Sequence, residues 1–410
     1  MFSGAPEVII LGIIFISLFF QVFLLITFFE KKENKLTKVK KGGPTLFSVC
    51  IIVPVWNEER TLRGTIESLL ALNYPKDKLE ILVIDDGSTD NTLSIAQEFE
   101  HEPQIKIFSK ENGGKHTAVN FGINQTTAEL VGCLDADSFV DKNALQEIIQ
   151  VFQNPDMMAV TPCMIVKSPK TFIQRAQKIE YTVGALLKRI FGDLSAIQVT
   201  PGPFSIFRRK VFEDLGLYKK AYNTEDFEIA LRMHKHGYKI GNAPRAFVYT
   251  TTPATPYRLF RQRLRWVQGN LLNLIDYREL FFRVQYGHLG MLILPMAVVY
   301  YFIALFISMY SVIHFSQWVG EKIGKVSATG ITPPNFNFDW FYIDTSTLSL
   351  LAVLLFVITL TLISFGIRMT RERGSLLELV SFFVVYPILA PFWLWRAGID
   401  LLRGKHNSWR

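Results

Sequence analysis

Long apolar runs lie near both ends of the chain. The first, Val8 to Phe29, holds 22 residues without a charge, enough for a helix to cross the roughly 30 Å hydrocarbon core of a bilayer. Three more follow at Leu289 to Ile313, Thr345 to Ile367 and Leu379 to Trp395. The last has only 17 residues and contains two prolines, so it is predicted to be either a short span or a bent, re-entrant segment. The pattern predicts a membrane protein with two or three C-terminal spans.

Between these runs the pattern changes to that of an α/β domain. From Leu46 onward, short β-branched runs alternate with polar-capped helical patterns, which is typical of a parallel sheet. The predicted early strands are Ser48 to Pro54, Leu79 to Ile84, Ile105 to Phe108 and Leu130 to Leu134. Ligands of such open sheets bind outside the carboxyl ends of the strands.

A polar motif follows each of these strands, so the motifs are expected to meet at one edge of the sheet. Their candidate ligand-binding residues are, in chain order, Glu58, Asp85 with Asp86, Lys115, and Asp135 with Asp137. Taken alone, Asp85 and Asp86 are equally typical of a turn followed by a helix cap. The Asn-Gly-Gly before Lys115 would let backbone N–H groups and a lysine approach a diphosphate.

The pair Asp135 and Asp137 is a stronger indication. Two carboxylates one residue apart at the end of an apolar strand suit a hard divalent cation that bridges two phosphates. A solvated acidic turn is the alternative, and the convergence of four polar strand ends makes it less favoured.

A second acidic pair, Glu225 and Asp226, begins a predicted helix after Thr224. Acidic residues favour the first turn of a helix through its dipole, so a purely structural role is one interpretation. The other is that one carboxylate acts as a general base toward a nucleophilic hydroxyl. The residues alone do not decide which of the two it is.

The segment Pro256 to Arg283 is basic and amphipathic, which is typical of a helix at a membrane interface. Within it Gln262, Arg265 and Trp266 can share one helix face. The planar fork of arginine suits a diphosphate, and tryptophan offers a flat surface for a sugar ring. Upstream, the turn around Gly202 is equally consistent with a structural loop and with the lining of an acceptor channel.

Charge and cysteine content narrow the class of protein. The 44 Lys and Arg against 36 Asp and Glu are compatible with nucleic acid, anionic lipid or a phosphate-bearing substrate. Six lysines lie between Lys31 and Lys41, directly after the first apolar run, so a positive-inside signal is favoured and a nucleic-acid partner is not expected. The three cysteines, Cys50, Cys133 and Cys163, are widely spaced and are predicted to be reduced core residues.

The four motifs occur in a characteristic order. Asp85-Asp86, Asp135-Ala-Asp137, Thr224-Glu-Asp226 and Gln262-Arg-Leu-Arg-Trp266, flanked by membrane helices, resemble the processive family-2 glycosyltransferases. This group includes the hyaluronan, cellulose, chitin and poly-N-acetylglucosamine synthases. The phrases that begin at Thr200 and Thr224 look most like the bacterial poly-β-1,6-N-acetylglucosamine synthases. Several of those relatives have two N-terminal spans, whereas one is predicted here.

The resemblance implies an α/β fold of the GT-A nucleotide-diphospho-sugar transferase type with flanking transmembrane and interfacial helices. The expected division is a transmembrane anchor at 1–30, a basic juxtamembrane linker at 31–45, a cytosolic catalytic domain at 46–254, an amphipathic interfacial segment at 255–285 and a membrane region at 286–410.

It also implies roles for residues that match the motifs of the family. The implied assignments are Glu58, Asp85, Asp86, Lys115 and Arg265 to the donor, Asp135 and Asp137 to Mg²⁺ or Mn²⁺, Asp226 as base with Glu225 beside it, and Gln262, Trp266 and Gly202 to the acceptor.

The expected function is that of a membrane-bound inverting enzyme that polymerises a β-linked polysaccharide from a UDP-sugar, UDP-N-acetylglucosamine in the first instance. The alternatives are a hyaluronan-like or cellulose-like synthase, transfer of one sugar to a lipid carrier, and a transporter or sugar-nucleotide sensor without chemistry. The transporter is disfavoured because the runs at 289–313 and 345–367 carry no charged residue. The expected partners are the donor, the growing polysaccharide, the lipid of the plasma membrane and a small membrane accessory subunit.

Overall fold

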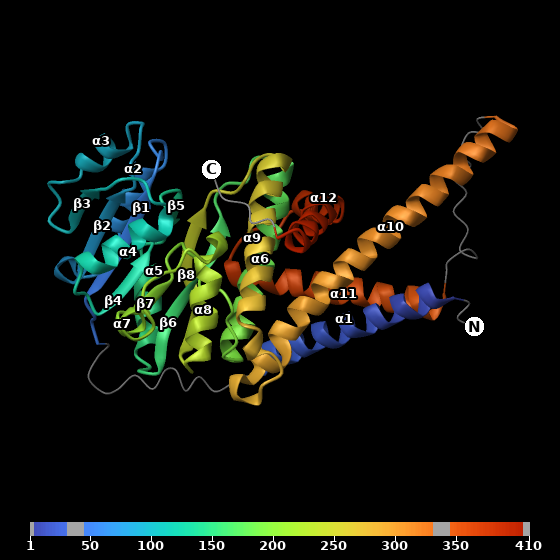
Figure 1. Ribbon diagram of the computed structural model, residues 1–410, viewed down its shortest axis with the longest axis horizontal. Coiled ribbons are helices and arrows are strands. Elements are labelled where there is room, and N and C mark those ends of the chain that lie inside the picture. Colours follow the sequence, from blue (N-terminus) through green and yellow to red (C-terminus); the bar gives the residue numbers. More distant parts are fainter. Residues whose placement is uncertain (1–3, 31–44, 331–344, 405–410) are drawn as a thin grey trace.

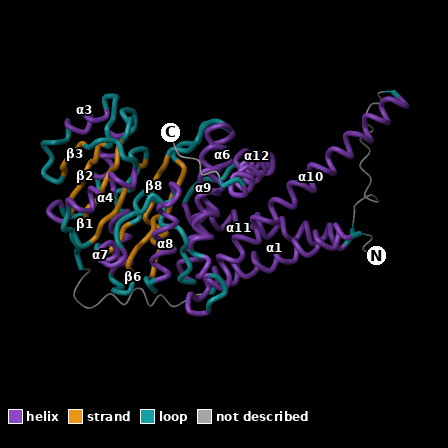
Figure 2. The backbone as a smooth tube through the Cα atoms, in the orientation of Figure 1, coloured by secondary structure: helices purple, strands orange, loops and turns teal. Residues whose placement is uncertain are grey.

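The computed structural model describes residues 4–30, 45–330 and 345–404. An α/β domain built on one eight-stranded sheet occupies one end of the molecule, and long helices extend from it (Figure 1). Figure 2 shows the same division, with every strand in the domain and only helix and loop beyond it. The predicted basic linker at 31–45 and the end of the tail lie almost entirely outside the described residues.

The four predicted parallel strands are confirmed. They are β1 (Val49–Val55), β2 (Leu79–Asp85), β3 (Ile105–Ser109) and β4 (Leu130–Cys133), and they lie side by side in the order β3-β2-β1-β4. Because all four run in the same direction, the motifs that follow β1, β2 and β4 emerge at one edge of the sheet.

The other half of the sheet is mixed rather than parallel. Here β7 (Ile206–Arg208) pairs antiparallel with both β4 and β6 (Met157–Val166), and β6 pairs parallel with β8 (Lys239–Thr250), which pairs antiparallel with β5 (Ser138–Val140). Of these strands only β6 is predicted by the sequence, from the apolar run Met158 to Val166. Strands of three residues, such as β5 and β7, are too short to give a period-two signal.

Helices cover both faces of the sheet, which explains why β1, β2 and β4 are buried along almost their whole length. In β1, Ile51 and Val53 pack on the side of α2 (Leu62–Leu70) and α5 (Ala144–Phe152), whereas Ile52 packs on the opposite side. That opposite side is covered by α4 (Lys115–Gln125), α7 (Lys210–Leu215) and α8 (Glu225–Lys235), and α3 (Thr92–Gln97) lies at the β2–β3 end. The three cysteines are buried and free, as predicted.

Four helices of the described residues are long and apolar enough to cross a membrane. They are α1 (Ala5–Phe29), α10 (Leu294–Thr329) with the π-helical turn Leu289–Ile293 before it, α11 (Thr347–Thr370) and α12 (Leu376–Leu402). The third C-terminal run is not broken at its prolines, because Pro387 and Pro391 both lie inside the continuous helix α12. In Figure 1, α12 is seen almost end-on, whereas α1 and α11 lie along each other across the picture.

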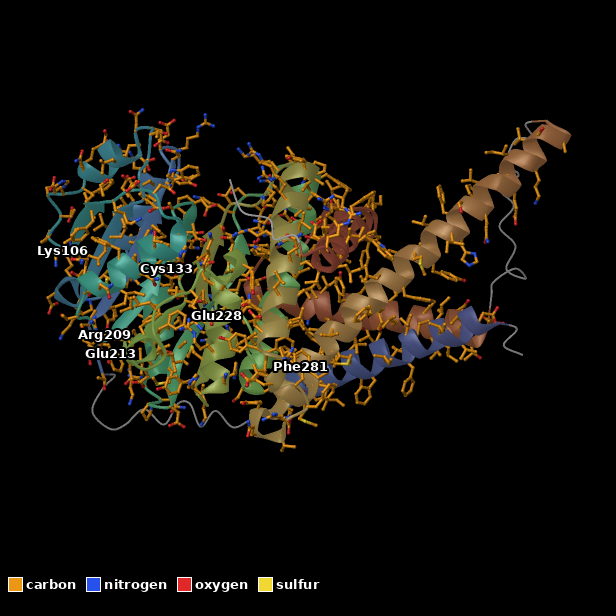
Figure 3. The ribbon with its side chains drawn as sticks, in the orientation of Figure 1. Lys106, Cys133, Arg209, Glu213, Glu228 and Phe281 are labelled. Atoms are coloured by element: carbon orange, nitrogen blue, oxygen red, sulfur yellow. The ribbon has the colours of Figure 1, made fainter. Side chains whose placement is uncertain are left out.

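Two further helices, α6 (Phe172–Asp193) and α9 (Pro256–Asp276), connect the sheet to these long helices. On one side α6 packs on β6 and β8, and on the other it packs on α11 and α12. A Cβ added at Gly366 of α11 would lie 2.8 Å from the carbonyl oxygen of Thr182, so α11 approaches α6 as closely as a glycine allows. After α9, the chain turns at Phe281, labelled in Figure 3, and enters α10. The domain and the long helices therefore share a continuous packed interface.

Candidate active site

The end of β4 brings the first acidic motif against the start of α4. Lys115, the first residue of α4, forms a salt bridge with Asp135. The turn that contains Gly202 closes over this pair, because a Cβ at Gly202 would lie 2.5 Å from Lys115 Nζ and 3.4 Å from Asp135 Oδ1. The structure thus brings together three predicted site residues: Lys115 for the sugar donor, Asp135 for the metal ion and Gly202 for the acceptor sugar.

Asp137 lies in an environment with an excess of negative charge. Burial raises the pKa of its carboxyl to about 7, with further contributions from Asp135 and Glu58, and Lys115 acts in the opposite direction. Glu58 itself is half-buried and accepts a hydrogen bond of 2.7 Å from the hydroxyl of Thr61. The predicted residues after β1 and β4 therefore interact through their charges across the sheet edge.

Asp85 and Asp86 are both buried at the end of β2. Asp85 accepts hydrogen bonds from the Ser109 hydroxyl at 2.9 Å and the Ser88 N–H at 3.2 Å. Asp86 accepts the N–H groups of Gly113 and Gly114 at 3.1 and 2.8 Å. The glycine N–H groups that the sequence assigned to a diphosphate are thus bound to Asp86, which is a correction to that expectation.

Lys110 is a site residue that the sequence did not single out. Its Nζ lies 2.5 Å from Asp86 Oδ1 and 3.0 Å from the hydroxyl of Thr117. Its one sequence signal is its position directly after β3, the same position at which the other strand-end motifs begin.

The second acidic pair lies at the start of α8. The N–H and hydroxyl of Thr200 both donate to the carbonyl oxygen of Asp226, at 3.1 and 2.9 Å. Because Phe204 in the same turn donates to the carbonyl of Cys133 at the end of β4, the turn joins the two acidic motifs. Burial and the adjacent Glu225 raise the pKa of Asp226 to about 6, and the charges of Lys115 and Arg265 act against this rise.

Helix α9 reaches the acidic pair through a very close contact with α8. A Cβ added at Gly269 would lie 2.3 Å from Oγ1 of Thr224, the residue that caps α8. The same hydroxyl oxygen accepts a hydrogen bond of 2.9 Å from Asn273. One turn before Gly269, Arg265 donates to the carbonyl of Asn223 at 3.3 Å. The predicted arginine is thereby held beside the start of α8.

The two remaining residues of this cluster have different surroundings. The side-chain oxygen of Gln262 is buried and has no hydrogen-bond partner among the described residues. The ring of Trp266 is half-buried, and the guanidinium carbon of Arg263 lies 4.2 Å from its centroid. Arg263 was not among the predicted site residues, because in the sequence it is one of several arginines in a basic helix.

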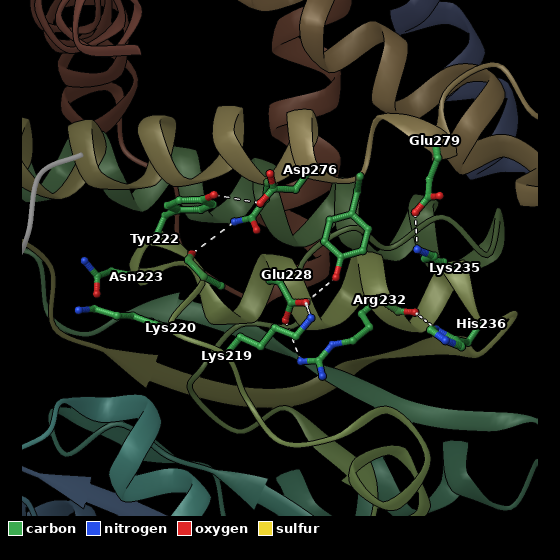
Figure 4. Close-up of a pocket in the computed structure, with 13 residues that line it drawn as sticks. Lys219, Lys220, Tyr222, Asn223, Glu228, Arg232, Lys235, His236, Asp276 and Glu279 are labelled. Atoms are coloured by element: carbon green, nitrogen blue, oxygen red, sulfur yellow. Dashed lines mark hydrogen bonds and ion pairs between the residues drawn. The ribbon is translucent and has the colours of Figure 1, made fainter. Parts of the chain in front are cut away.

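A cavity of about 650 Å³ lies where the loop before α8 meets α8 and α9 (Figure 4). Within the described parts of the chain, none of the predicted site residues lines it, although Asn223, which binds Arg265, does. Its lining consists of Lys219, Lys220, Ala221, Tyr222, Asn223, Glu228, Arg232, Lys235, His236, Asn273, Asp276, Tyr277 and Glu279. The backbone of Ala221, Tyr222 and Asn223 is left-handed, with φ of 37°, 56° and 61°. The strained loop therefore lines this cavity and directly precedes Thr224 and the acidic pair.

The chemistry of the acidic motif fits a divalent cation. Among the described residues no group of three or more His, Cys, Asp or Glu side chains could by itself enclose a metal ion. Asp135 and Asp137 supply carboxylate oxygens, and burial together with the negative charges of Asp135 and Glu58 raises the pKa of Asp137, which a bound cation would offset. Cations such as Mg²⁺ are commonly held by one or two carboxylates, with substrate phosphates and water as the other ligands. The two aspartates fit that arrangement.

Comparisons with known proteins agree with this picture. Residues 50–216 match the model of glycosyl transferase family 2. The chain is 29% identical over 401 residues to a poly-beta-1,6-N-acetyl-D-glucosamine synthase of Staphylococcus epidermidis, which covers 95% of this chain and 91% of the relative. It is 32% identical over 265 residues to the synthase of Staphylococcus aureus strain COL, which covers 62% of this chain and 64% of the relative.

Among solved structures, the fold is similar to that of a mannosyltransferase from Pyrobaculum calidifontis in complex with GDP-Man and Mn²⁺. The TM-score is 0.62 at 18% identity, with 97% of this chain and 98% of the other covered. The likeness supports the GT-A type of fold together with the arrangement of the long helices around it.

The close approach of α8 and α9 predicts the effect of one added methyl group. Gly269→Ala would force its Cβ into Thr224, and overpacking of this kind costs about 1–3 kcal/mol. We expect a lower Tm and faster amide hydrogen exchange over residues 221–228, measured by thermal melts and mass spectrometry. Gly184→Ala in α6 is the matched control, because nothing lies within 4 Å of a Cβ there. Equal behaviour of the two variants would contradict the proposed contact.

Proposed function

Because the chain belongs to glycosyltransferase family 2, we propose that it polymerises a β-linked polysaccharide from UDP-N-acetylglucosamine at the plasma membrane. One observation carries the proposal: the similarity to a poly-β-1,6-N-acetylglucosamine synthase runs through the catalytic domain and the membrane helices alike. The grouping of Asp226, Lys115 and Arg265 beside the Asp135 motif supports it.

In the proposed reaction, Asp226 takes the proton from an acceptor hydroxyl, which attacks the anomeric carbon of the donor as UDP leaves. The raised pKa of Asp226 supports this role, because a base works best when its pKa lies near the working pH. Glu225 tunes that base through its charge. No covalent bond to the enzyme is needed in a single inverting displacement.

The leaving diphosphate develops negative charge, which must be neutralised. The charges of Lys115 and Arg265 both act on Asp226, and we assign these two cations to the diphosphate. A divalent ion held by Asp135 and Asp137 would act as a Lewis acid on the phosphate oxygens. Asp85, Asp86 and Glu58 are assigned to the nucleoside on the basis of their positions after β2 and β1, and this list of roles remains a proposal.

Gln262, Trp266 and Gly202 are assigned to the acceptor. The buried, unpartnered oxygen of Gln262 supports a ligand there, because buried acceptors are normally bonded. Gly202 lies against Lys115 and Asp135, where the absence of a side chain lets the turn approach both residues closely.

We further propose that α12 lies along the catalytic domain and does not cross the membrane. Near its start, Glu378 forms a 2.9 Å ion pair with Lys178 of α6, and near its end, Asp400 accepts a 2.8 Å hydrogen bond from Gln268 of α9. The two ends of α12 are thus bound to α6 and α9, the two helices that connect the sheet to the long helices. With α1, α10 and α11 as spans, the catalytic domain and the C-terminus lie together in the cytoplasm, as the positive-inside rule requires for Arg396 and Arg403.

The proposal predicts donor and metal requirements. Membranes that contain the protein should convert UDP-N-acetylglucosamine into a polymer, and EDTA should stop the reaction until Mg²⁺ or Mn²⁺ is added. The assay is incorporation of labelled sugar from a panel of UDP-sugars, followed by sizing and linkage analysis. Incorporation from UDP-glucose or UDP-glucuronate instead would favour a cellulose-like or hyaluronan-like enzyme, and a product with a single sugar on lipid would contradict polymerisation.

Removal of the proposed base should leave the fold intact and stop the chemistry. We expect Asp226→Asn to lower kcat by about a hundredfold to ten thousandfold, the usual contribution of a general base, with little change in the donor KM. Asp156→Asn is the control, since Asp156 lies on the surface in a 2.9 Å pair with Lys239. Full activity of Asp226→Asn would remove this residue from the mechanism.

The pH dependence follows from the same carboxyl. A base must be deprotonated, so activity should rise with pH and reach half of its plateau near the pKa of Asp226, about 6. Because a neighbouring negative charge raises a carboxyl pKa, Glu225→Gln should move this acidic limb to lower pH by about one unit. The measurement is kcat/KM against pH for both proteins. A limb that stays in place or moves upward in Glu225→Gln would argue against Asp226 as the titrating group.

A further inference from the structure

Three helices meet at one carboxylate beside the proposed acceptor site. Glu180 of α6 accepts a 2.6 Å hydrogen bond from Nη2 of Arg263 on α9. The same carboxylate oxygen accepts the hydroxyl of Tyr386 on α12. The long helix α12 is thereby connected to the helix that carries Gln262, Arg265 and Trp266.

Glu180, Arg263 and Tyr386 form one contact group, and its arginine contacts Trp266. Arg263 is only 4% exposed, so its charge is costly unless it is paired, and Glu180 is its ion-pair partner. Its guanidinium also lies over the ring of Trp266, with 4.2 Å between the guanidinium carbon and the ring centroid. A shift of Glu180 would move Arg263, and the guanidinium group that packs against the Trp266 ring would move with it.

The group also lies within electrostatic reach of the catalytic carboxylates. Burial raises the pKa of Tyr181, the neighbour of Glu180 on α6, to about 12. The charges that act on the Tyr181 hydroxyl include Arg263 and Glu180 as well as Asp137 and Asp135. Glu180 and Arg263 therefore lie close to the motif of Asp135 and Asp137.

We propose that Glu180 and Tyr386 are positioning residues through which α12 sets the placement of Trp266, and that they determine how long the growing chain stays bound between additions. The inference rests on the proposed polymerase function. It assigns to α12 a role in product length, in addition to its packing against the domain. Neither residue touches the donor in this scheme, so their effect falls on the acceptor.

Tyr386→Phe tests the proposal, because it removes one hydroxyl and keeps the ring. Loss of one hydrogen bond changes an equilibrium by about two- to tenfold. We expect the mean product length to fall, and the KM for an added N-acetylglucosamine oligosaccharide to rise, by factors in that range, with the donor KM unchanged. The assay uses the full-length protein in lipid nanodiscs with UDP-N-acetylglucosamine, and the products are sized by gel and mass spectrometry.

Tyr301→Phe is the matched control. The Tyr301 hydroxyl donates a 3.0 Å hydrogen bond to the carbonyl of Leu394, so this variant also removes a tyrosine hydroxyl bound to α12, but from the α10 side. Glu180→Gln is the second variant: it keeps an acceptor oxygen for Tyr386 and removes the charge that pairs with Arg263. It should shorten the product further, and it keeps the test open if Tyr386→Phe does not fold.

The outcomes distinguish the positioning role of Glu180 and Tyr386 from the proposed polymerase function. A shorter product in Tyr386→Phe and Glu180→Gln, with wild-type length in Tyr301→Phe, supports the positioning role. Equal length in all four proteins, or a loss confined to the donor KM, overturns it while leaving polymerisation intact. A wild-type protein that adds only one sugar would instead overturn the proposed function itself.

Discussion

Repulsion among carboxylates is the constraint on which the arrangement of this protein depends. Asp135 and Asp137 follow β4, Glu225 and Asp226 begin α8, and the charges of both pairs act on Lys115 at the start of α4. Burial and the like charge of Glu225 both disfavour ionisation of Asp226, which is why its pKa lies above its ordinary range. Only a rigid scaffold can hold such groups together without a ligand, and the parallel half of the sheet provides it. A phosphate-bearing donor would then bind together with its cation. The carboxylates of the site suit the metal ion, and its two basic side chains suit the phosphates.

The second half of the site comes from α9, and its position depends on contacts outside the catalytic domain. Gly269 allows α9 to approach Thr224, and Arg265 is thereby placed beside the acidic pair. On its other side α9 packs against α12 in an apolar cluster that includes Leu264 and Trp393. Helix α9 is therefore held between the sheet domain and the long apolar helix α12. This arrangement connects the long apolar helices to the proposed acceptor site through packing and buried polar contacts.

Much of the fold and of the candidate site could be predicted from local patterns. Apolar strands of five to seven residues followed by polar motifs identified β1, β2 and β3, and the ordered motifs indicated the family. The roles assigned to individual residues remain proposals. Lys110 and Arg263 were missed because a lysine after a strand and an arginine in a basic helix are common. Their partners, Asp86 and Glu180, lie 24 and 83 residues away along the chain.

By itself, the sequence determined the class of this protein, an α/β domain with acidic strand ends between apolar helices. Strands and helices impose their own spacing on apolar and polar residues, so these features can be recognised locally. Only the tertiary structure decided which hydrogen-bond donors pair with which hydrogen-bond acceptors. It showed that the N–H groups of Gly113 and Gly114 bind Asp86, and that one end of α12 is bound to α6 and the other to α9. Apolar length cannot distinguish a helix that crosses a bilayer from one that lies along a domain, since both bury the same kind of side chain. The proposed position of α12 rests on the polar contacts at its two ends, which join residues more than 100 positions apart.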